Sequence, residues 1–507
     1  MLKRIMQRRS GLAAVRSFGR QLYAGAKCAP GACRTVRECL YAWVVHSLIL
    51  TLLFVALQGW KDDIPGVRKT EDAAMDAVFQ LNANRDPPRS HVMPPIELYD
   101  IDEASYRAWG SPVFTPRDKL LRLIQRASRA GASVIMVDID LARPSTGVLG
   151  AEDAALSPAD RELGEYLARI NESTDPAHPV VILTRTFRWP LDAQGRAATG
   201  ALMEPVPSFL DAYVPQQKRV FWGSPLFSVD PDRMLRRWRL AELYCDSGGR
   251  LAIVPSVQLL AVIAQNYAQE SGRALAADAV RRTLEQLGTL VRGAPCSAAR
   301  DSGPVHDYLR RHARELPRAA SVIMLSPTDQ QKWVDLAAGG DAERVIYRIA
   351  PIHEIGQKTQ IALSSAEMLL APTEPRLDAD GRIVLIGGTF DESGDFHRTP
   401  LASRMPGVYV LANAIDTLAY YGQFRAPPLW LSVGVLCAAT LLLHLVFSLF
   451  PVLIGKLIAM VVLTGFLFVL SVAIFSYGAG FTYALPLFIL QAVYMITIIV
   501  HARRKAH

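Results

Sequence analysis

The chain has 507 residues, of which 50% are hydrophobic, and a mean hydropathy of +0.17. It is too apolar for an ordinary soluble enzyme and too polar for a transporter that lies wholly in the membrane, so we expect a mixed architecture. The net charge of +8 arises in residues 1–40, which hold nine Lys or Arg residues and one acid. A basic segment beside a hydrophobic one indicates membrane topology, and we predict no nucleic-acid partner.

The first hydrophobic segment, Tyr41 to Leu57, has Trp43 and Trp60 near its two ends. Its length approaches the ~20 residues that span a bilayer, and aromatic residues favour the membrane interfaces. A cleaved signal peptide is the alternative, but it requires a short basic region and an A-x-A cleavage site. We predict a basic cytoplasmic tail at 1–40 and an uncleaved transmembrane helix at 41–60.

Residues 61–426 contain no hydrophobic run long enough to span a membrane. Near their start, a strand pattern at Ile96–Ile101 is followed by an amphipathic helix from Pro116 to Ala130 and a strand at Val134–Ile139. Two strands joined by a helix pair in parallel. We therefore predict an α/β domain with a central, mostly parallel sheet.

The middle of this region carries further elements. We expect helices at Asp153–Ile170 and Val254–Glu270, and strands at Val180–Leu183 and Arg344–Ile349. Arg236–Tyr244 alternates basic and apolar residues, which favours a solvated edge strand over an anion-binding surface. The basic cluster in question consists of Arg233, Arg236, Arg237 and Arg239.

A strand, a charged loop and a helix close the polar region. The strand Ile383–Ile386 is stopped by Gly387 and Gly388, and the loop Asp391–Arg398 follows. Apolar residues then recur at helical spacing from Val408 to Leu418. Open α/β sheets bind ligands at the carboxyl ends of their strands, which is where this loop lies.

Three hydrophobic segments end the chain, and we assign transmembrane helices to 429–449, 457–476 and 484–502, with a basic tail at 503–507. This arrangement places the basic connections on one side of the membrane, as the positive-inside rule requires. We predict a multi-pass bacterial inner-membrane protein with four transmembrane α-helices, one N-terminal and three C-terminal. Both termini would be cytoplasmic and residues 61–426 periplasmic.

Two parts of the polar region resemble the CHASE2 domain, an extracytoplasmic sensory module of bacterial signalling receptors. The residues that carry the resemblance are Leu98–Ser105, Pro116–Arg117, Gly131–Ala132, Val137–Ile139, Ile383–Thr389, Asp395, Thr399–Pro400, Pro406–Val408 and Asn413–Ile415. It extends over residues 65–426 and leaves 190–215 and 270–340 unmatched. In this family one span precedes the domain and three follow it.

The resemblance implies a sensor, and family members usually continue into a kinase or cyclase domain. This chain ends soon after its last span, so we expect no fused output domain and a signal relayed to a separate partner protein. A structural or assembly subunit of an envelope complex is the alternative. Receptors of this type often work as dimers, although no pattern here marks a dimer face. No G-x-S-x-G motif is present, and we predict neither enzymatic activity nor a cofactor.

Acidic residues follow the strands at their carboxyl ends. If these strands are neighbours, the acids converge and could bind a divalent cation or a cationic ligand. The alternative, and the commoner role of such acids, is to cap helices and hold loops. The candidate ligand-binding residues are Asp100, Asp102, Asp138, Asp140, Asp395, His397 and Arg398.

Cys245 and Cys296 are the two cysteines of the polar region. They can pair if that region is periplasmic, but spacing alone does not decide between a disulfide and two free thiols. Three further cysteines in the basic tail lack a fourth ligand at tetrahedral-site spacing, which favours free thiols over a metal site.

Overall fold

The computed structural model describes most of the polar region. It covers residues 65–82, 96–145, 156–190, 202–246, 248–299, 304–351, 361–371 and 379–424, with a few isolated positions between 44 and 465. The chain divides into two compact units, and the α/β domain lies within the unit Phe79–Phe424. Among the described residues, no helix is both long and apolar enough to cross a membrane. Apart from the isolated positions, the spans predicted at 41–60, 429–449, 457–476 and 484–502 lie outside the described residues.

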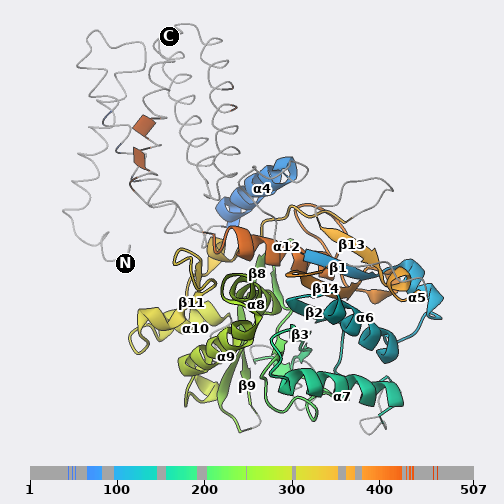
Figure 1. Cartoon of the computed structure of the whole chain (residues 1–507). Helices are drawn as coiled ribbons and strands as arrows, with labels where there is room; N and C mark the ends of the chain where they lie inside the picture. The colour runs from blue at the N-terminus through green and yellow to red at the C-terminus, as the bar shows by residue number, and fades with distance from the viewer. Residues whose placement is uncertain are drawn as a thin grey trace. The chain divides into compact units, whose positions relative to one another are not determined.

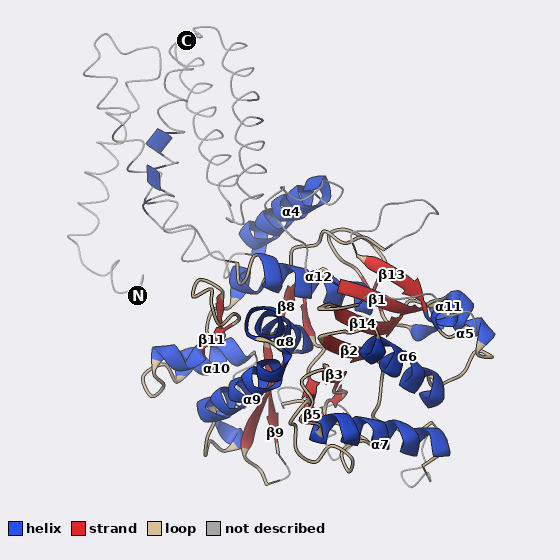
Figure 2. Cartoon of the chain, in the orientation of Figure 1, coloured by secondary structure: helices blue, strands red, loops and turns tan. Residues whose placement is uncertain are grey.

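The domain is built around a six-stranded parallel sheet with the order β13-β1-β14-β2-β3-β6 (Figure 2). Its strands are β1 (Ile96–Ile101), β2 (Val134–Asp138), β3 (Val180–Thr184), β6 (Val220–Gly223), β13 (Ala362–Ser365) and β14 (Ile383–Gly388). The predicted α/β class with a central parallel sheet is confirmed. The strand that comes last in sequence, β14, lies between β1 and β2, so the three strands followed by acidic residues are neighbours.

Helices lie on both faces of the sheet (Figure 1). One face is covered by α8 (Val257–Ser271) and α12 (Gly407–Tyr420), and the other by α6 (Arg117–Arg129) and α7 (Pro158–Glu172). The other described helices are α4 (Pro65–Asn82), α5 (Glu103–Ala108), α9 (Arg273–Leu290), α10 (Val305–Arg311) and α11 (Ala366–Leu369). Leu98 and Leu385 share a buried cluster with residues of α8 and α12, whereas Tyr99 and Ile386 share one with α6 and α7. Because both faces are covered, the strands read as near-continuous apolar runs.

Local sequence signals start two of these helices. At α7 the Ser157 hydroxyl accepts from the N–H of Asp160, and the Asp160 carboxylate accepts from the N–H of Ser157, which forms a capping box. At α8 the Ser256 hydroxyl caps the first turn. Each cap satisfies backbone donors that the first turn of a helix leaves unpaired.

Short antiparallel hairpins extend the domain beyond its sheet. They pair β4 (Phe187–Arg188) with β5 (Glu204–Pro205), β7 (Phe227–Val229) with β8 (Leu235–Trp238), β9 (Ala241–Cys245) with β10 (Leu251–Pro255), β11 (Val322–Met324) with β12 (Trp333–Asp335), and β15 (Phe396–His397) with β16 (Met405–Pro406). Cys245 at the end of β9 forms a disulfide with Cys296, and the two Cα atoms are 5.7 Å apart. Of the two alternatives left by their spacing, the structure has the disulfide.

The predicted strand at Arg344–Ile349 is wrong, because only Arg344 pairs, through an isolated antiparallel bridge with Arg237, and the segment forms no strand of the described sheets. The N–H of Ile346 donates to Thr417 Oγ1 at 3.0 Å, and the N–H of Ile349 donates to Asn413 Oδ1 at 2.8 Å. Side chains of α12 thus satisfy the backbone groups that a neighbouring strand would otherwise satisfy.

The predicted solvated edge strand at Arg236–Tyr244 is also wrong. The segment divides into β8 and β9, and the side chains of Arg236 and Arg237 are buried against Asp230. The arginines of this alternating pattern can be buried because Asp230, which is itself buried, supplies a negative charge to both.

Candidate functional site

Two of the predicted acids flank one glycine at the carboxyl edge of the sheet. Asp100 of β1 and Asp138 of β2 are each in register with Gly387 of β14, which lies between them. Residues in register on neighbouring strands project to the same face of a sheet. Leu98 lies two residues before Asp100 and packs with α8 and α12. Both carboxylates therefore point to the face that α12 covers.

Helix α12 begins directly over this glycine. A Cβ atom on Gly387 would come within 2.8 Å of Val408 Cγ2, so only a glycine allows the first turn this close. The N–H of Gly407 donates to the backbone oxygen of Asp395 at 2.9 Å, and a Cβ on Gly407 would overlap Asp395 Oδ2. The N-terminal turn of α12, the end of the helix that carries partial positive charge, thus lies against the carboxylate of Asp395.

Asp100 is buried, and Thr389 is its one hydrogen-bond donor among the described residues. Its exposed fraction is 6%, and the Thr389 hydroxyl lies 2.8 Å from Oδ1 and 3.0 Å from Oδ2. Burial raises the pKa of Asp100 to about 7; the Thr389 hydrogen bond opposes this shift and the charge of Asp102 adds to it. Asp100 also lines a cleft of about 600 Å³ that includes Pro406 and Tyr409 at the start of α12.

The pKa of Asp138 depends on two residues of the loop Asp391–Arg398, namely Asp395 and His397. Burial raises its pKa first, the charge of Asp395 raises it further, and His397 lowers it. The His397 ring contacts Asp395 through Nε2 and Oδ1 at 2.8 Å. The loop therefore sets the charge around Asp138, and the sheet edge groups Asp138, Asp395 and His397.

The remaining candidates hold loops. Asp102 caps α5 by accepting from the N–H of Ser105 at 2.8 Å. Asp140 Oδ1 accepts from the N–H of Ala142 and from the Thr186 hydroxyl. The side chain of Arg398 is exposed, and its backbone oxygen accepts from the N–H of Leu235. For Asp102 and Asp140 the structure shows the capping and loop-holding role.

The two central acids are too far apart to share one metal ion. They lie two strands apart, so their Cα atoms are about 10 Å from each other, whereas calcium takes oxygen ligands at about 2.3–2.6 Å. In the part of the chain that the structure describes, no three His, Cys, Asp or Glu side chains are grouped to hold a metal ion. The arrangement instead suits ligands or protons that act on one carboxylate at a time.

The residues that complete the site were missed from the sequence. Thr389 binds Asp100, and Arg404 pairs with Asp391 at 2.8 Å while its guanidinium lies 3.9 Å from the centre of the Phe396 ring. Arg404 follows no spacing rule, because it lies between β15 and β16 and the pairing of these strands brings it to the edge, whereas Thr389 directly follows β14. The glycines at the end of a strand and at the start of a helix, Gly387 and Gly407, were the available signals of close approach.

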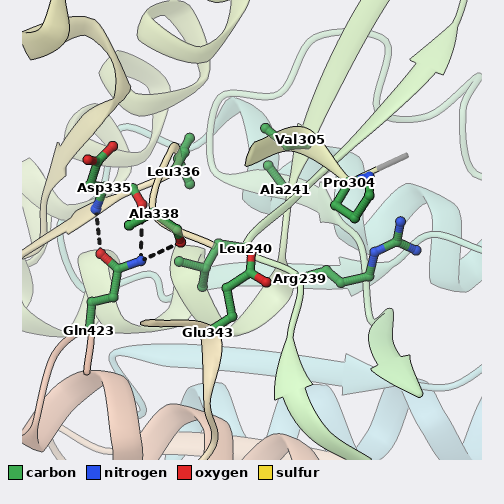
Figure 3. Close-up of a pocket in the computed structure, with 10 residues that line it drawn as sticks. All are labelled: Arg239, Leu240, Ala241, Pro304, Val305, Asp335, Leu336, Ala338, Glu343 and Gln423. Carbon is green, nitrogen blue, oxygen red and sulfur yellow. Dashed lines mark hydrogen bonds between the residues drawn. The ribbon is translucent and has the colours of Figure 1, made fainter. Parts of the chain in front are cut away.

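A second cavity lies between Gln423, which follows α12, and the end of the β11–β12 hairpin (Figure 3). Its volume of about 10 Å³ has room for roughly one water molecule. Gln423 borders it, accepts from the N–H of Asp335 at 2.7 Å, and donates to the backbone oxygens of Asp335 and Ala338. This cavity is too small for an organic ligand, but Gln423 fixes the chain just after α12.

Comparison with known proteins gives one family. A family model described as "CHASE2 domain" matches residues 48–449. Searches of curated proteins and of solved structures gave no match.

Proposed function

The chain belongs to the CHASE2 domain family of extracytoplasmic sensors, and from this premise we propose that it is a bacterial inner-membrane sensor that relays a periplasmic signal to a separate partner protein. Four spans, at 41–60, 429–449, 457–476 and 484–502, would anchor it with both termini in the cytoplasm. The proposed role is binding and relay, with no enzymatic step, and a homodimer is compatible with it.

The observation that carries this proposal is the meeting of the acidic edge with the first turn of α12. The helix has 14 residues and is the last described element before the hydrophobic segment at 429–449. Its side chains Asn413 and Thr417 bind the backbone of the 345–349 segment, so it is fixed along its length. A force on its first turn has a short covalent route to the predicted span.

Electrostatics supplies that force. A carboxylate near the N-terminal turn of a helix is worth about 0.3–1 kcal/mol, rising to about 2 kcal/mol where it is partly buried. Protonation or ligation of Asp100 or Asp138 removes or redistributes this attraction. Because the pKa of Asp100 lies at about 7, small changes in the pH of the periplasm can change its charge.

The substitution Gly407→Ala tests the relay. The added methyl group occupies the position of Asp395 Oδ2, so the half-exposed Asp395 side chain must move away from the helix start. Asp138 then loses the neighbouring charge that raises its pKa. We expect the full chain in nanodiscs to show a pH-dependent change in hydrogen exchange at Tyr420–Phe424 between pH 6 and 8, after correction for intrinsic exchange. In G407A this change should shrink and shift to lower pH.

Gly288→Ala is the matched control, because a Cβ on Gly288 of α9 meets no atom within 4 Å. If G407A and wild type respond identically, the relay through α12 is excluded.

Crosslinkers placed in the two cytoplasmic tails test the partner: capture only through the periplasmic domain would favour the assembly-subunit alternative. Phosphatase fusions after residues 300 and 507 test the topology, and only the first should be active in the periplasm.

A further inference from the structure

The cleft beside Asp100 has the size and lining of a site for a small organic molecule. Its volume of about 600 Å³ falls in the usual range of about 300–1,000 Å³ for such sites. Half of the residues that line it are apolar, and these are Pro351, Leu363, Phe396, Leu401, Ala402 and Pro406. The apolar body of a ligand can pack against this part of the wall.

The charges in the cleft do not balance. Three charged residues line it, and two of them, Asp391 and Arg404, pair with each other at 2.8 Å. The Arg404 guanidinium is further held over the Phe396 ring. Asp100 remains, without a cationic partner among the lining residues. The cleft thus favours a ligand with one positive charge.

The hydrogen bonds of Asp100 are also incomplete. An ionised carboxylate has about four acceptor positions, whereas the hydroxyl of Thr389 supplies one hydrogen to both oxygens. Burying a charge without compensating donors is costly. A primary ammonium group brings three N–H donors together with the missing charge, and charge-assisted hydrogen bonds of this kind are roughly twice as strong as neutral ones.

A hydrated metal ion fits this cleft less well than an organic cation. Divalent cations require several oxygen ligands, and the described part of the chain contains no group of three such side chains. The apolar wall would gain nothing from a metal ion. It would bury the carbon chain of an organic cation instead.

We propose that the cleft between Asp100 and the start of α12 binds a small primary amine in its ammonium form, with the ammonium group on Asp100 and an apolar body against Leu363 and Leu401. The inference rests on the sensor function proposed above and names the chemical class of its ligand.

Calorimetric titration of the full chain in nanodiscs tests the proposal, with n-butylammonium as the probe. Three matched probes separate its features: n-butanol lacks the charge, tetramethylammonium lacks the N–H donors, and magnesium lacks the apolar body. We expect n-butylammonium to bind at least tenfold more tightly than any of the three. Its affinity should rise from pH 6 to pH 8, because Asp100, with its pKa at about 7, becomes ionised over this range.

Three substitutions locate the binding site: two within the cleft and one control outside it. Asp100→Asn keeps the shape of the carboxyl group without its charge, and we expect it to weaken n-butylammonium binding at least tenfold. Asp118→Asn, at an exposed position in the first turn of α6, removes the same charge outside the cleft and should have no effect. Leu401→Trp fills the cleft without altering Asp100 and should also abolish binding, which keeps the test valid if D100N does not fold.

Equal affinity of wild type and D100N would overturn the proposal, as would equal binding of n-butanol or tighter binding of magnesium. The sensor function has its own test, because the G407A experiment uses protons as the stimulus and needs no amine. Absent amine binding with an intact G407A effect refutes the ligand class alone. Loss of the G407A effect refutes the relay whatever the cleft binds.

Discussion

Two buried aspartates of this domain have nearly the same exposure and opposite surroundings. Asp230 is 7% exposed and accepts from Arg236 at 2.9 Å and from Arg237 at 2.7 Å. Asp100 is 6% exposed and has one hydroxyl donor. Burial alone therefore does not distinguish an acid that holds the fold from one that is available to a ligand; the partners make the difference.

The two surroundings have different energetic consequences. A buried carboxylate recovers its desolvation cost only when charged partners and hydrogen bonds surround it. Asp230 has such partners, and Arg236 also accepts the N–H of Val345 through its backbone oxygen, so the pair lies at a junction of two segments. Asp100 lacks such partners, so its ionised form carries an uncompensated desolvation cost. Binding of a proton or a cation removes part of that cost.

The largest expected effect comes from breaking the satisfied pair. Removing one partner of a buried ion pair costs about 3–5 kcal/mol, because the opposite charge is left uncompensated. Asp230→Asn should therefore lower the free energy of unfolding by this amount. Urea unfolding of the full chain in detergent, followed by tryptophan fluorescence, to which buried Trp238 contributes, measures the loss.

Asp232→Asn is the control on the same arginine. Asp232 also binds Arg236, at 2.8 Å, but its side chain is 44% exposed. Exposed pairs are worth at most about 1 kcal/mol. If the two substitutions cost the same, burial of the Asp230 pair is not what stabilises this junction.

Replacing Asp100 by Asn should raise the free energy of unfolding near pH 8, in contrast to the loss expected for Asp230→Asn. The pKa of Asp100 is about 7 in the folded chain against 3.8 for an unperturbed aspartate, so the folded state binds the proton more tightly. The stabilisation is complete below pH 3.8 and is lost as the pH rises through 7. The slope reaches about 1.4 kcal/mol per pH unit, and the full loss is at most about 4 kcal/mol. Asp100→Asn should remove this slope and make the chain more stable than wild type at pH 8.

Unfolding curves from pH 4 to pH 8 check this prediction. The advantage of D100N should be near zero at pH 4 and grow steadily up to pH 8. Burial also raises the pKa of Glu242 and of Asp416, so the wild-type slope contains their contributions. The difference between the two curves isolates Asp100, and parallel curves would contradict the assignment.

The same contrast explains what could be predicted from the sequence. Apolar runs and alternating elements were sufficient to predict the parallel sheet and to place Asp100 and Asp138 at its carboxyl edge. The strands β6 and β13 were missed as sheet members because their four-residue runs carry little pattern. Helix α12 was predicted as a helix. The close packing of its first turn against Gly387 was not predicted, because it depends on tertiary contact.

Pairing is the information that the sequence lacked. Arg236 and Arg237 alternate with apolar residues as a solvated strand would, and only the turn before β8 brings Asp230 to them. The segment at 344–349 has the composition of a strand, yet its backbone is satisfied by α12. In both cases a side chain outside the local pattern decides the structure.

The smallest expected effect belongs to the acid that caps α5. Asp102 accepts from the N–H and the hydroxyl of Ser105, and loss of an N-cap costs about 1 kcal/mol. Asp102→Ala should therefore destabilise the chain slightly at every pH. It should also shift the Asp100 titration to lower pH, because the charge of Asp102 contributes to the raised pKa of Asp100. NMR titration of selectively labelled aspartate carboxyl carbons would resolve this shift, and an unchanged Asp100 midpoint would show that burial alone sets its charge.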